Sequence, residues 1–293
     1  MDHFSIAELA KFSGVQAHTI RIWEKRYSAL KPGRSKGNTR FYDNGELRRL
    51  LNIVTLLHFD YKISELGIMG DAELYRLVEE HKLRHSEDPE EYFISQLIAT
   101  GLSYDETHFS NIFAHCLLRF GLEEAWLRVL YPMLERVGLL WSCDKIGAGN
   151  EHFLTNLLNR KLNAAIDLLA PPKNDGSKWL LCLPENEFHE TGLLMAQYML
   201  RKNRKASLYL GANVPLDTMG TTAKQTGADY LLLFLVHNRD EEETHKYLSL
   251  VEKKFPGKII YVACAPHLPG LKRGKRIVYL HAAEDLRNLL TGV

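Results

Sequence analysis

The chain has 293 residues, of which 45% are hydrophobic and 25% charged, a composition typical of a globular protein with more than one core. Lys and Arg number 37 against 36 Asp and Glu, so the net charge of +1 gives no general sign of a nucleic-acid or membrane partner. The longest apolar runs, such as residues 230–236, are far shorter than the roughly 20 residues of a membrane helix, and the first residues do not have the pattern of a signal peptide. Cysteines stand at 116, 143, 182 and 264 without a close pair, which excludes a disulfide framework or a Cys-rich zinc site and favours a reducing cytoplasm.

Positive charge is concentrated near the N-terminus, where residues 21–49 contain nine basic and three acidic side chains. Residues 5–12 and 16–27 are predicted to be helices separated by a Ser-Gly-Val turn, the pattern of a helix-turn-helix whose second helix enters the major groove of DNA. The glycine-rich basic segment 31–42 is predicted to form a β-hairpin wing against phosphates. A basic cluster alone is usually a solvated surface, but the coincidence of these three features favours DNA binding.

The sequence of this segment also resembles a known family. Residues 19–27 read Thr-Ile-Arg-Ile-Trp-Glu-Lys-Arg-Tyr and residues 38–42 read Asn-Thr-Arg-Phe-Tyr, an order similar to the mercury-resistance-regulator (MerR) family and to its light- and cobalamin-responsive branch. The resemblance, which covers residues 4 to about 69, implies a winged helix-turn-helix. The side chains it places near DNA are Thr19, Arg21, Arg26, Arg34, Arg40 and Tyr42. Trp23 follows Ile20 by three residues, so it either faces the duplex or packs on the core.

Two breaks divide the remaining chain. The first helical run ends around residues 67–71, and residues 170–176 combine two prolines with an Asn-Asp-Gly turn. We therefore expect three domains, with the bounds 1–70, 71–170 and 177–293. Helical periodicity in the middle domain predicts helices near 71–83, 89–100, 105–119, 122–140 and 149–169.

The C-terminal domain alternates short apolar segments with helical ones. The predicted strands are 179–183, 206–210, 230–236, 258–262 and 277–280, and the predicted helices are 191–203, 216–226, 241–255 and 282–291. Because strands separated by helices form parallel sheets, we predict an α/β domain with a parallel sheet.

A histidine between carboxylates follows the first of these strands. Ligands of open α/β sheets bind beyond the carboxyl ends of the strands, and a His there can offer one ring nitrogen to a metal. Glu187, two residues before His189, is placed to accept the other ring N–H, and Gly192 lets the next helix approach a bulky group. Taken alone, such a loop is more often a solvated turn. However, Glu187-x-His189-x-x-Gly192 resembles the cobalamin-binding loop of base-off/His-on proteins, which implies that His189 is the lower axial ligand of cobalt.

A second resemblance lies in the helical domain. Trp141 is followed, after nine residues, by Glu151-His152, which is similar to the motif with which CarH-type photoreceptors cover the upper face and adenosyl group of adenosylcobalamin. The alternatives are core packing for Trp141 and a charge pair at a helix N-terminus for Glu151-His152. The whole chain thus resembles CarH/LitR-type regulators, which implies a winged helix-turn-helix, a four-helix bundle and a flavodoxin-like (Rossmann-like) α/β cobalamin domain.

The sequence departs from that family at three places. Ser142 stands where the best-known photoreceptors have a His that captures cobalt after illumination, and Phe234 stands where many cobalamin domains have a Ser. Ala263 and Cys264 replace a Gly-Gly that admits the buried benzimidazole, so their side chains are expected to crowd it. Cys264 has two interpretations, a ligand or redox switch and a small buried thiol, and the second is favoured.

These patterns predict a cytoplasmic DNA-binding repressor rather than an enzyme, whose homo-oligomerisation (dimer or tetramer) and operator binding depend on adenosylcobalamin and light. Oligomers must form without the family's usual coiled coil, because no heptad repeat is sustained and Pro89 and Gly101 interrupt the region. The alternative is a cobalamin-independent regulator that keeps the fold without the cofactor. A corrinoid methyltransferase or mutase module is disfavoured by the attached DNA-binding domain and the lack of a substrate barrel.

Overall fold

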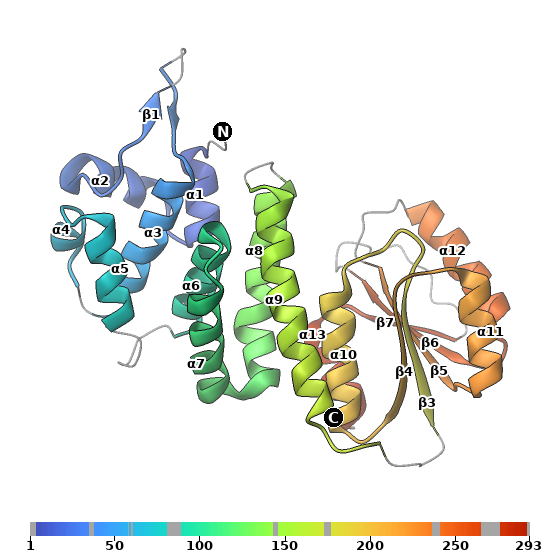
Figure 1. Ribbon diagram of the computed structural model, residues 1–293. Coiled ribbons are helices and arrows are strands. Elements are labelled where there is room, and N and C mark those ends of the chain that lie inside the picture. The colour runs from blue at the N-terminus through green and yellow to red at the C-terminus, as the bar shows by residue number, and fades with distance from the viewer. Residues whose placement is uncertain are drawn as a thin grey trace. The chain divides into compact units, whose positions relative to one another are not determined.

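The computed structural model describes residues 4–34, 38–57, 59, 61–80, 89–142, 146–172, 177–235, 241–264 and 276–291. The chain separates into two compact units, residues 1–155 and 156–293 (Figure 1). Within the described ranges, every helix is too short or too polar to span a bilayer.

The predicted helix-turn-helix is present. Helix α1 (Ile6–Ser13) begins at a capping box, in which the Ser5 hydroxyl accepts from the Glu8 amide and the Glu8 carboxylate accepts from the Ser5 amide. It ends at Gly14, which has a φ of 73°. Helix α2 (Ala17–Tyr27) follows, and strands β1 (Gly33–Arg34) and β2 (Arg40–Phe41) then pair antiparallel as the wing.

Three further helices complete the core beneath the helix-turn-helix: α3 (Asn44–Leu57), α4 (Ile63–Leu66) and α5 (Asp71–Glu80). Arg49 joins them, because its guanidinium donates to the carbonyls of Ala29, Gly67 and Met69 and pairs with Asp71. Helix α5 packs on α3 and buries Leu74, Leu77 and Val78 in the same cluster as Ile53 and Leu56, although its sequence position places it in the predicted middle domain. Trp23 packs against this cluster, which agrees with the core interpretation of that residue.

The helical bundle consists of α6 (Pro89–Ser103), α7 (Glu106–Ala125), the π-helix η1 (Trp126–Leu130), α8 (Tyr131–Ser142) and α9 (Ala148–Asp167). The break predicted between residues 119 and 122 is a kink at Gly121, whose φ is 71°. Gly101 does not interrupt α6: a Cβ there would clash with the Leu154 side chain, so the glycine allows α9 to approach. The Asn150 amide group then donates to the Gly101 carbonyl at 2.9 Å.

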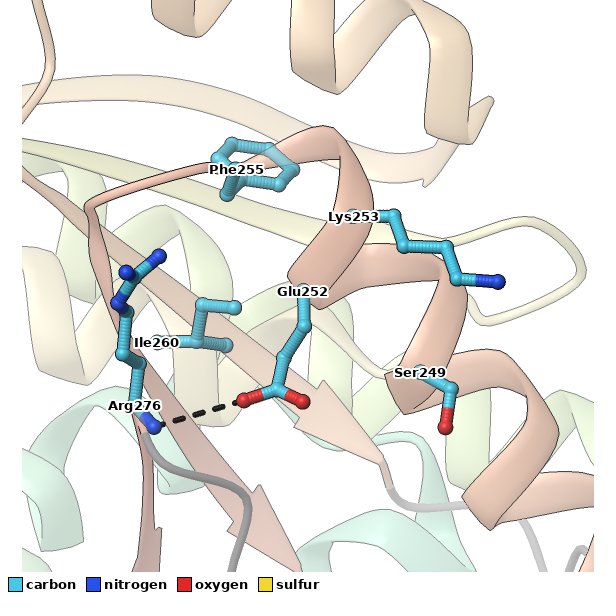
Figure 2. Close-up of a pocket in the computed structure, with 6 residues that line it drawn as sticks. All are labelled: Ser249, Glu252, Lys253, Phe255, Ile260 and Arg276. Atoms are coloured by element: carbon cyan, nitrogen blue, oxygen red, sulfur yellow. Dashed lines mark hydrogen bonds between the residues drawn. The ribbon is translucent and has the colours of Figure 1, made fainter.

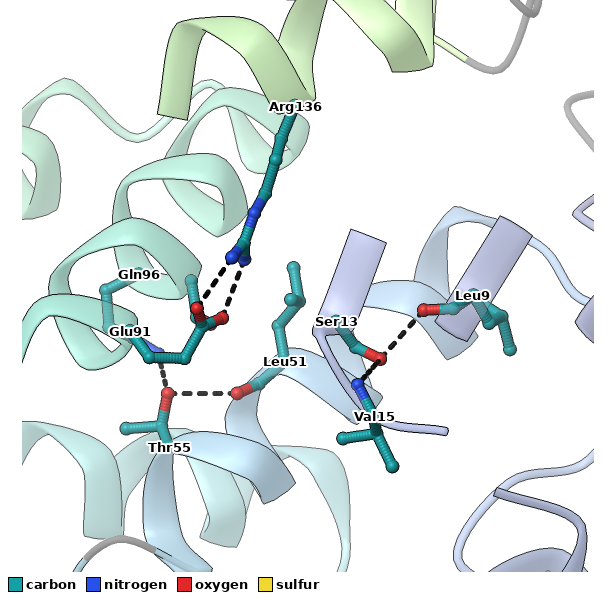
Figure 3. Close-up of polar contacts among 9 residues, drawn as sticks. Leu9, Ser13, Val15, Leu51, Thr55, Glu91, Gln96 and Arg136 are labelled. Atoms are coloured by element: carbon teal, nitrogen blue, oxygen red, sulfur yellow. Dashed lines mark hydrogen bonds and ion pairs between the residues drawn. The ribbon is translucent and has the colours of Figure 1, made fainter. Parts of the chain in front are cut away.

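Helix α6 is buried on nearly all sides, from Tyr92 to Gly101, because it lies between α3 and the other bundle helices. Two of its polar side chains, Glu91 and Gln96, bind partners on neighbouring helices. The Glu91 carboxylate binds the Arg136 guanidinium through two contacts of 2.7 Å, and the Gln96 amide donates to the Thr55 hydroxyl at 3.0 Å (Figure 3). The Thr55 hydroxyl in turn donates to the Leu51 carbonyl, so a polar network joins α3 to α6.

The α/β unit contains a parallel sheet with strand order β4-β3-β5-β6-β7. The strands are β3 (Lys178–Pro184), β4 (Ala206–Val214), β5 (Tyr230–Leu235), β6 (Ile259–Cys264) and β7 (Ile277–Leu280). The helices are α10 (Glu190–Lys202), α11 (Leu216–Thr226), α12 (Glu241–Lys254) and α13 (Ala283–Thr291). Figure 1 shows α10 and α13 on one face of the sheet and α11 and α12 on the other. This is the flavodoxin-like order, so the predicted fold class is confirmed, and its switch point lies between β3 and β5.

Candidate functional site

The loop after β3 carries the predicted histidine and carboxylate at the switch point of the sheet. Oε1 of Glu187 accepts from Nδ1 of His189 at 2.5 Å and from the backbone amides of Phe188 and His189 at 3.1 and 3.3 Å. The Glu187 carboxylate is buried, whereas the imidazole is 46% exposed. Because Nδ1 faces a carboxylate, its N–H tautomer is favoured and Nε2 is the ring nitrogen that carries the lone pair.

The end of β4 holds this loop in place. The Asn213 side-chain oxygen accepts from the Asn186 amide at 3.0 Å, and the Asn213 amide donates to the Glu187 carbonyl at 3.0 Å. Both asparagines have a positive φ, 63° and 54°, which Asn tolerates better than most residues. The orientation of His189 is therefore set by two neighbouring strands.

Glu190, to which the sequence analysis assigns no role, fastens the first turn of α10 to β4. Its Oε1 accepts from the Tyr209 hydroxyl and from the Ala212 amide, each at 3.1 Å. Burial, together with the nearby Glu190 charge, raises the pKa of Tyr209. A Cβ at Gly211 would lie 2.7 Å from Oε1 of Glu190, so this glycine is needed for the contact. The only sequence signal for this role is a further carboxylate close after Glu185 and Glu187.

The predicted close approach at Gly192 is present, and the bulky group is Phe234. A Cβ on Gly192 would lie 2.8 Å from Cε1 of Phe234, so the ring is pressed against the backbone of α10. Phe234 belongs to the carboxyl end of β5, and its partner in β6 is Ala263. Cys264 comes next and is buried, which raises the pKa of its thiol. Burial supports the interpretation of Cys264 as a packed thiol.

The residues of the second predicted motif lie at one end of the bundle. Trp141 lies in the last turn of α8 with 48% of its surface exposed, so core packing does not account for it. Nδ1 of His152 lies 2.9 Å from Oε2 of Glu151 near the start of α9, as in the charge-pair alternative, while the His152 side chain stays exposed. The side chain of Ser142 lies outside the described residues.

Tyr104 lies at the same end of the bundle, in the turn between α6 and α7 and next to Phe153 of α9. Its φ is 55° and it is 54% exposed, with its ring 5.4 Å from that of Phe153 on α9. Its hydroxyl would lie 3.0 Å from a Cβ at Gly149, so the glycine leaves room for it. Sequence reasoning missed this half-exposed aromatic, whose only signal was its place in a turn between two helices.

Most of the residues predicted to meet DNA are accessible, with one correction. Arg21, Arg26, Arg34 and Arg40 are exposed and Thr19 is partly exposed. Tyr42, however, is fully buried, and its hydroxyl donates to Oε2 of Glu24 at 2.7 Å. Burial and the Glu24 carboxylate both raise the pKa of Tyr42. Since Nε of Arg40 donates to the other oxygen of Glu24 at 2.8 Å, Tyr42 supports the wing from within instead of facing a duplex.

A pocket on the α/β unit does not belong to this arrangement. It is lined by Ser249, Glu252, Lys253, Phe255, Ile260 and Arg276 (Figure 2). Ile260 lies early in β6 and Arg276 directly before β7, so the pocket lies toward the amino ends of these strands. Ligands of this fold class bind at the carboxyl ends, where His189 lies.

Comparisons with known proteins match two parts of the chain to described families and find relatives along most of its length. Residues 4–71 match the family described as MerR HTH family regulatory protein, and residues 91–166 match the B12 binding domain. The chain is 27% identical over 251 residues to the HTH-type transcriptional repressor CarH of Myxococcus xanthus, an alignment that covers 84% of this chain and 83% of that protein. It is 26% identical over 264 residues to the HTH-type transcriptional repressor CarA of the same organism, covering 89% of this chain and 83% of that protein. The monomethylamine corrinoid protein of Methanosarcina barkeri has a similar fold, with a TM-score of 0.50 at 12% identity, over 69% of this chain and 98% of that chain.

Proposed function

We propose that this chain, a CarH-type regulator of the MerR family, is a transcriptional repressor whose operator binding is controlled by cobalamin. The observation that carries the proposal is the Glu187–His189 pair at the switch point of a flavodoxin-like sheet. A second observation, the exposed basic helix and wing of the N-terminal unit, supports the DNA-binding part.

The donor set fits a corrinoid. A single imidazole suits a metal that already carries its other ligands in a macrocycle, and the buried carboxylate on Nδ1 raises the basicity of Nε2. In this proposal His189 would hold the cobalt, Glu187 would orient the imidazole, and Gly192 would keep α10 close to the site. The half-exposed Trp141, together with Glu151 and His152, would cover the bound group.

We further propose that the form bound is adenosylcobalamin and that light is one signal. Adenosylcobalamin, when bound, supplies a cobalt–carbon bond that light cleaves. A ligand shifts assembly only if it binds one assembly state better than the other. Contacts from Trp141, Glu151 and His152 would provide that difference in the dark and favour a homo-oligomer. An assembled dimer or tetramer binds an operator more tightly because its DNA-binding domains act together.

A specific observation favours a second candidate, a regulator that keeps the fold without the cofactor. The ring of Phe234 already fills the space beside Gly192, and Ala263 and Cys264 follow at the end of the adjacent strand. In that case assembly would be constitutive or would respond to another partner.

Cofactor retention distinguishes the two candidates. The purified chain is mixed with adenosylcobalamin in the dark, free ligand is removed by gel filtration, and absorbance is recorded before and after green light. Retained colour with a light-driven spectral change is expected. Colour without a light response would contradict the light proposal alone, and a colourless chain would contradict the cobalamin proposal and favour the second candidate.

A further inference from the structure

If His189 binds a corrinoid, as the proposed function requires, the space next to it determines where the corrinoid's nucleotide can lie. Cobalt in a corrinoid has one lower coordination position, so the base of the corrinoid's nucleotide and the imidazole of His189 compete for it. When His189 is the ligand, the displaced base remains tethered to the same face of the macrocycle. It must then either enter the protein beside His189 or stay in solvent.

The space at the start of α10, next to the His189 loop, is already filled by the side chain of Phe234. Gly192 lies three residues after His189, in the first turn of α10, and its missing side chain is the feature that opens space there. Ring atoms of Phe234 occupy that space, with Cε1, Cδ1 and Cζ at 2.8, 3.1 and 3.8 Å from where a Cβ would lie. A ring in such contact with a helix backbone leaves no room for a second planar group between them.

The neighbouring strand ends close the same region. Leu233, directly before Phe234, pairs with Cys182 of β3, the strand that leads into the His189 loop. On the other side Phe234 pairs with Ala263 and Leu235 with Cys264, whose thiol is buried. The aromatic side chain therefore lies at the carboxyl end of the central strand, between the loop strand and a strand end that has side chains instead of glycines.

We propose that Phe234 is a specificity-determining residue that keeps the nucleotide of a corrinoid out of the protein. The chain recognises the corrin ring through His189 and gains nothing from the nucleotide. Its ligand class therefore includes corrinoids that lack the nucleotide altogether, such as cobinamide. A smaller side chain at this position would open the space and let the base contribute to binding.

The test compares two corrinoids on the full chain. Dissociation constants for hydroxocobalamin and aquocobinamide are measured by absorbance titration for the wild type, Phe234→Ala and Phe234→Leu. The leucine variant retains an apolar side chain in case the alanine variant does not fold, and circular dichroism verifies folding of each. Tyr230→Leu is the matched control, because it shortens an aromatic side chain at the opposite end of the same strand.

We expect the wild type and Tyr230→Leu to bind cobinamide at least as tightly as cobalamin, because cobinamide has no base that competes with His189. We expect Phe234→Ala to bind cobalamin about tenfold tighter with little change for cobinamide, and Phe234→Leu to show a smaller change in the same direction. If the wild type binds both corrinoids but prefers cobalamin about tenfold, and the Phe234 variants do not increase that preference, the inference is overturned and the proposed function stands. If only the Phe234 variants retain cobalamin, the inference holds while the proposed function of the wild type fails. Retention of neither corrinoid by any variant would overturn both.

Discussion

Nδ1 of His189 lies 2.5 Å from Oε1 of Glu187, and that carboxylate is only 2% exposed. The same oxygen accepts two backbone amides of its own loop, and Asn213 of β4 fastens the loop from the neighbouring strand. The imidazole is thus oriented before any ligand arrives, which lowers the entropy cost of binding one.

Removing the charge of Glu187 tests this orientation. Glu187→Gln keeps the size of the side chain but cannot raise the basicity of the imidazole, so we expect cobalamin to bind about 10- to 100-fold more weakly in an absorbance titration. The control is Glu185→Gln, which alters an exposed carboxylate two residues away and should leave the affinity unchanged. Equal affinity of Glu187→Gln and wild type would show that the carboxylate does not act through the ring.

Substitution of Trp141 should affect oligomer formation much more than the free energy of unfolding. Because its side chain is half exposed, Trp141→Ala should lower the free energy of unfolding by about 1 kcal/mol or less, well below the cost of truncating a buried Trp. Assembly driven by adenosylcobalamin in the dark, measured by analytical ultracentrifugation, should be reduced. Leu139→Ala on the same helix is the control. Assembly of the Trp141 variant at the wild-type level would remove this residue from the proposed cover.

Arg40 tests the wing. Its side chain is exposed beside Glu24, and Arg40→Ala should weaken DNA binding and reduce the slope of log affinity against log salt by about one phosphate contact. The measurement is fluorescence anisotropy on one duplex, obtained by in vitro selection, over a range of salt concentrations. Lys224→Ala, which removes an exposed cation from the α/β unit, is the control. A slope unchanged by Arg40→Ala would mean that the wing does not contact phosphates.

Gln96 links the DNA-binding helices to the bundle. Its amide nitrogen donates to the Asn52 and Thr55 side chains at 3.3 and 3.0 Å, and its oxygen lies 3.1 Å from Nε2 of His108. Gln96→Leu leaves these buried groups without that partner, so the free energy of unfolding should fall by about 1–3 kcal/mol in urea. The exposed Gln225→Leu should change it by less than about 0.5 kcal/mol. Equal effects of the two substitutions would contradict a coupling role for the network.

Local patterns in the sequence predicted the features that depend on residues close in the chain. The spacing of two between Glu187 and His189 predicts that the carboxylate accepts a ring N–H of the histidine, and in the structure that nitrogen is Nδ1. Alternating apolar and helical segments predict the parallel sheet, because β3 and β5 are buried along most of their length and the connections from β3 to β6 each contain a helix.

Contacts between residues far apart in the chain were not predictable in this way. Gly192 predicts a bulky neighbour, but it does not predict that this neighbour is Phe234, which belongs to β5. Tyr42 lies two residues after Arg40 in a basic wing, a position that predicts a DNA contact. In the folded chain its hydroxyl instead donates to Glu24, which is 18 residues away in the sequence. Tyr104 has no periodicity that marks it, because its exposure results from the turn between two packed helices.

The bounds of the compact units show the same limit. The prolines at 171 and 172 predict a break near residue 170, whereas the two units divide at residues 155 and 156, within α9. The Thr191 hydroxyl on α10 donates to the Asn159 side chain at 2.8 Å, so the second half of α9 is bound to the α/β unit. A continuous helix gives no local signal of where its packing partners change.

Titration of wild type and His189→Ala with hydroxocobalamin tests most directly whether His189 binds the cobalt of a corrinoid. The wild type should retain the corrinoid through gel filtration and shift its visible spectrum as an imidazole becomes the lower ligand. His189→Ala, verified as folded by circular dichroism, should lose that shift and bind at least about tenfold more weakly. The same spectrum and affinity for both proteins would contradict the claim.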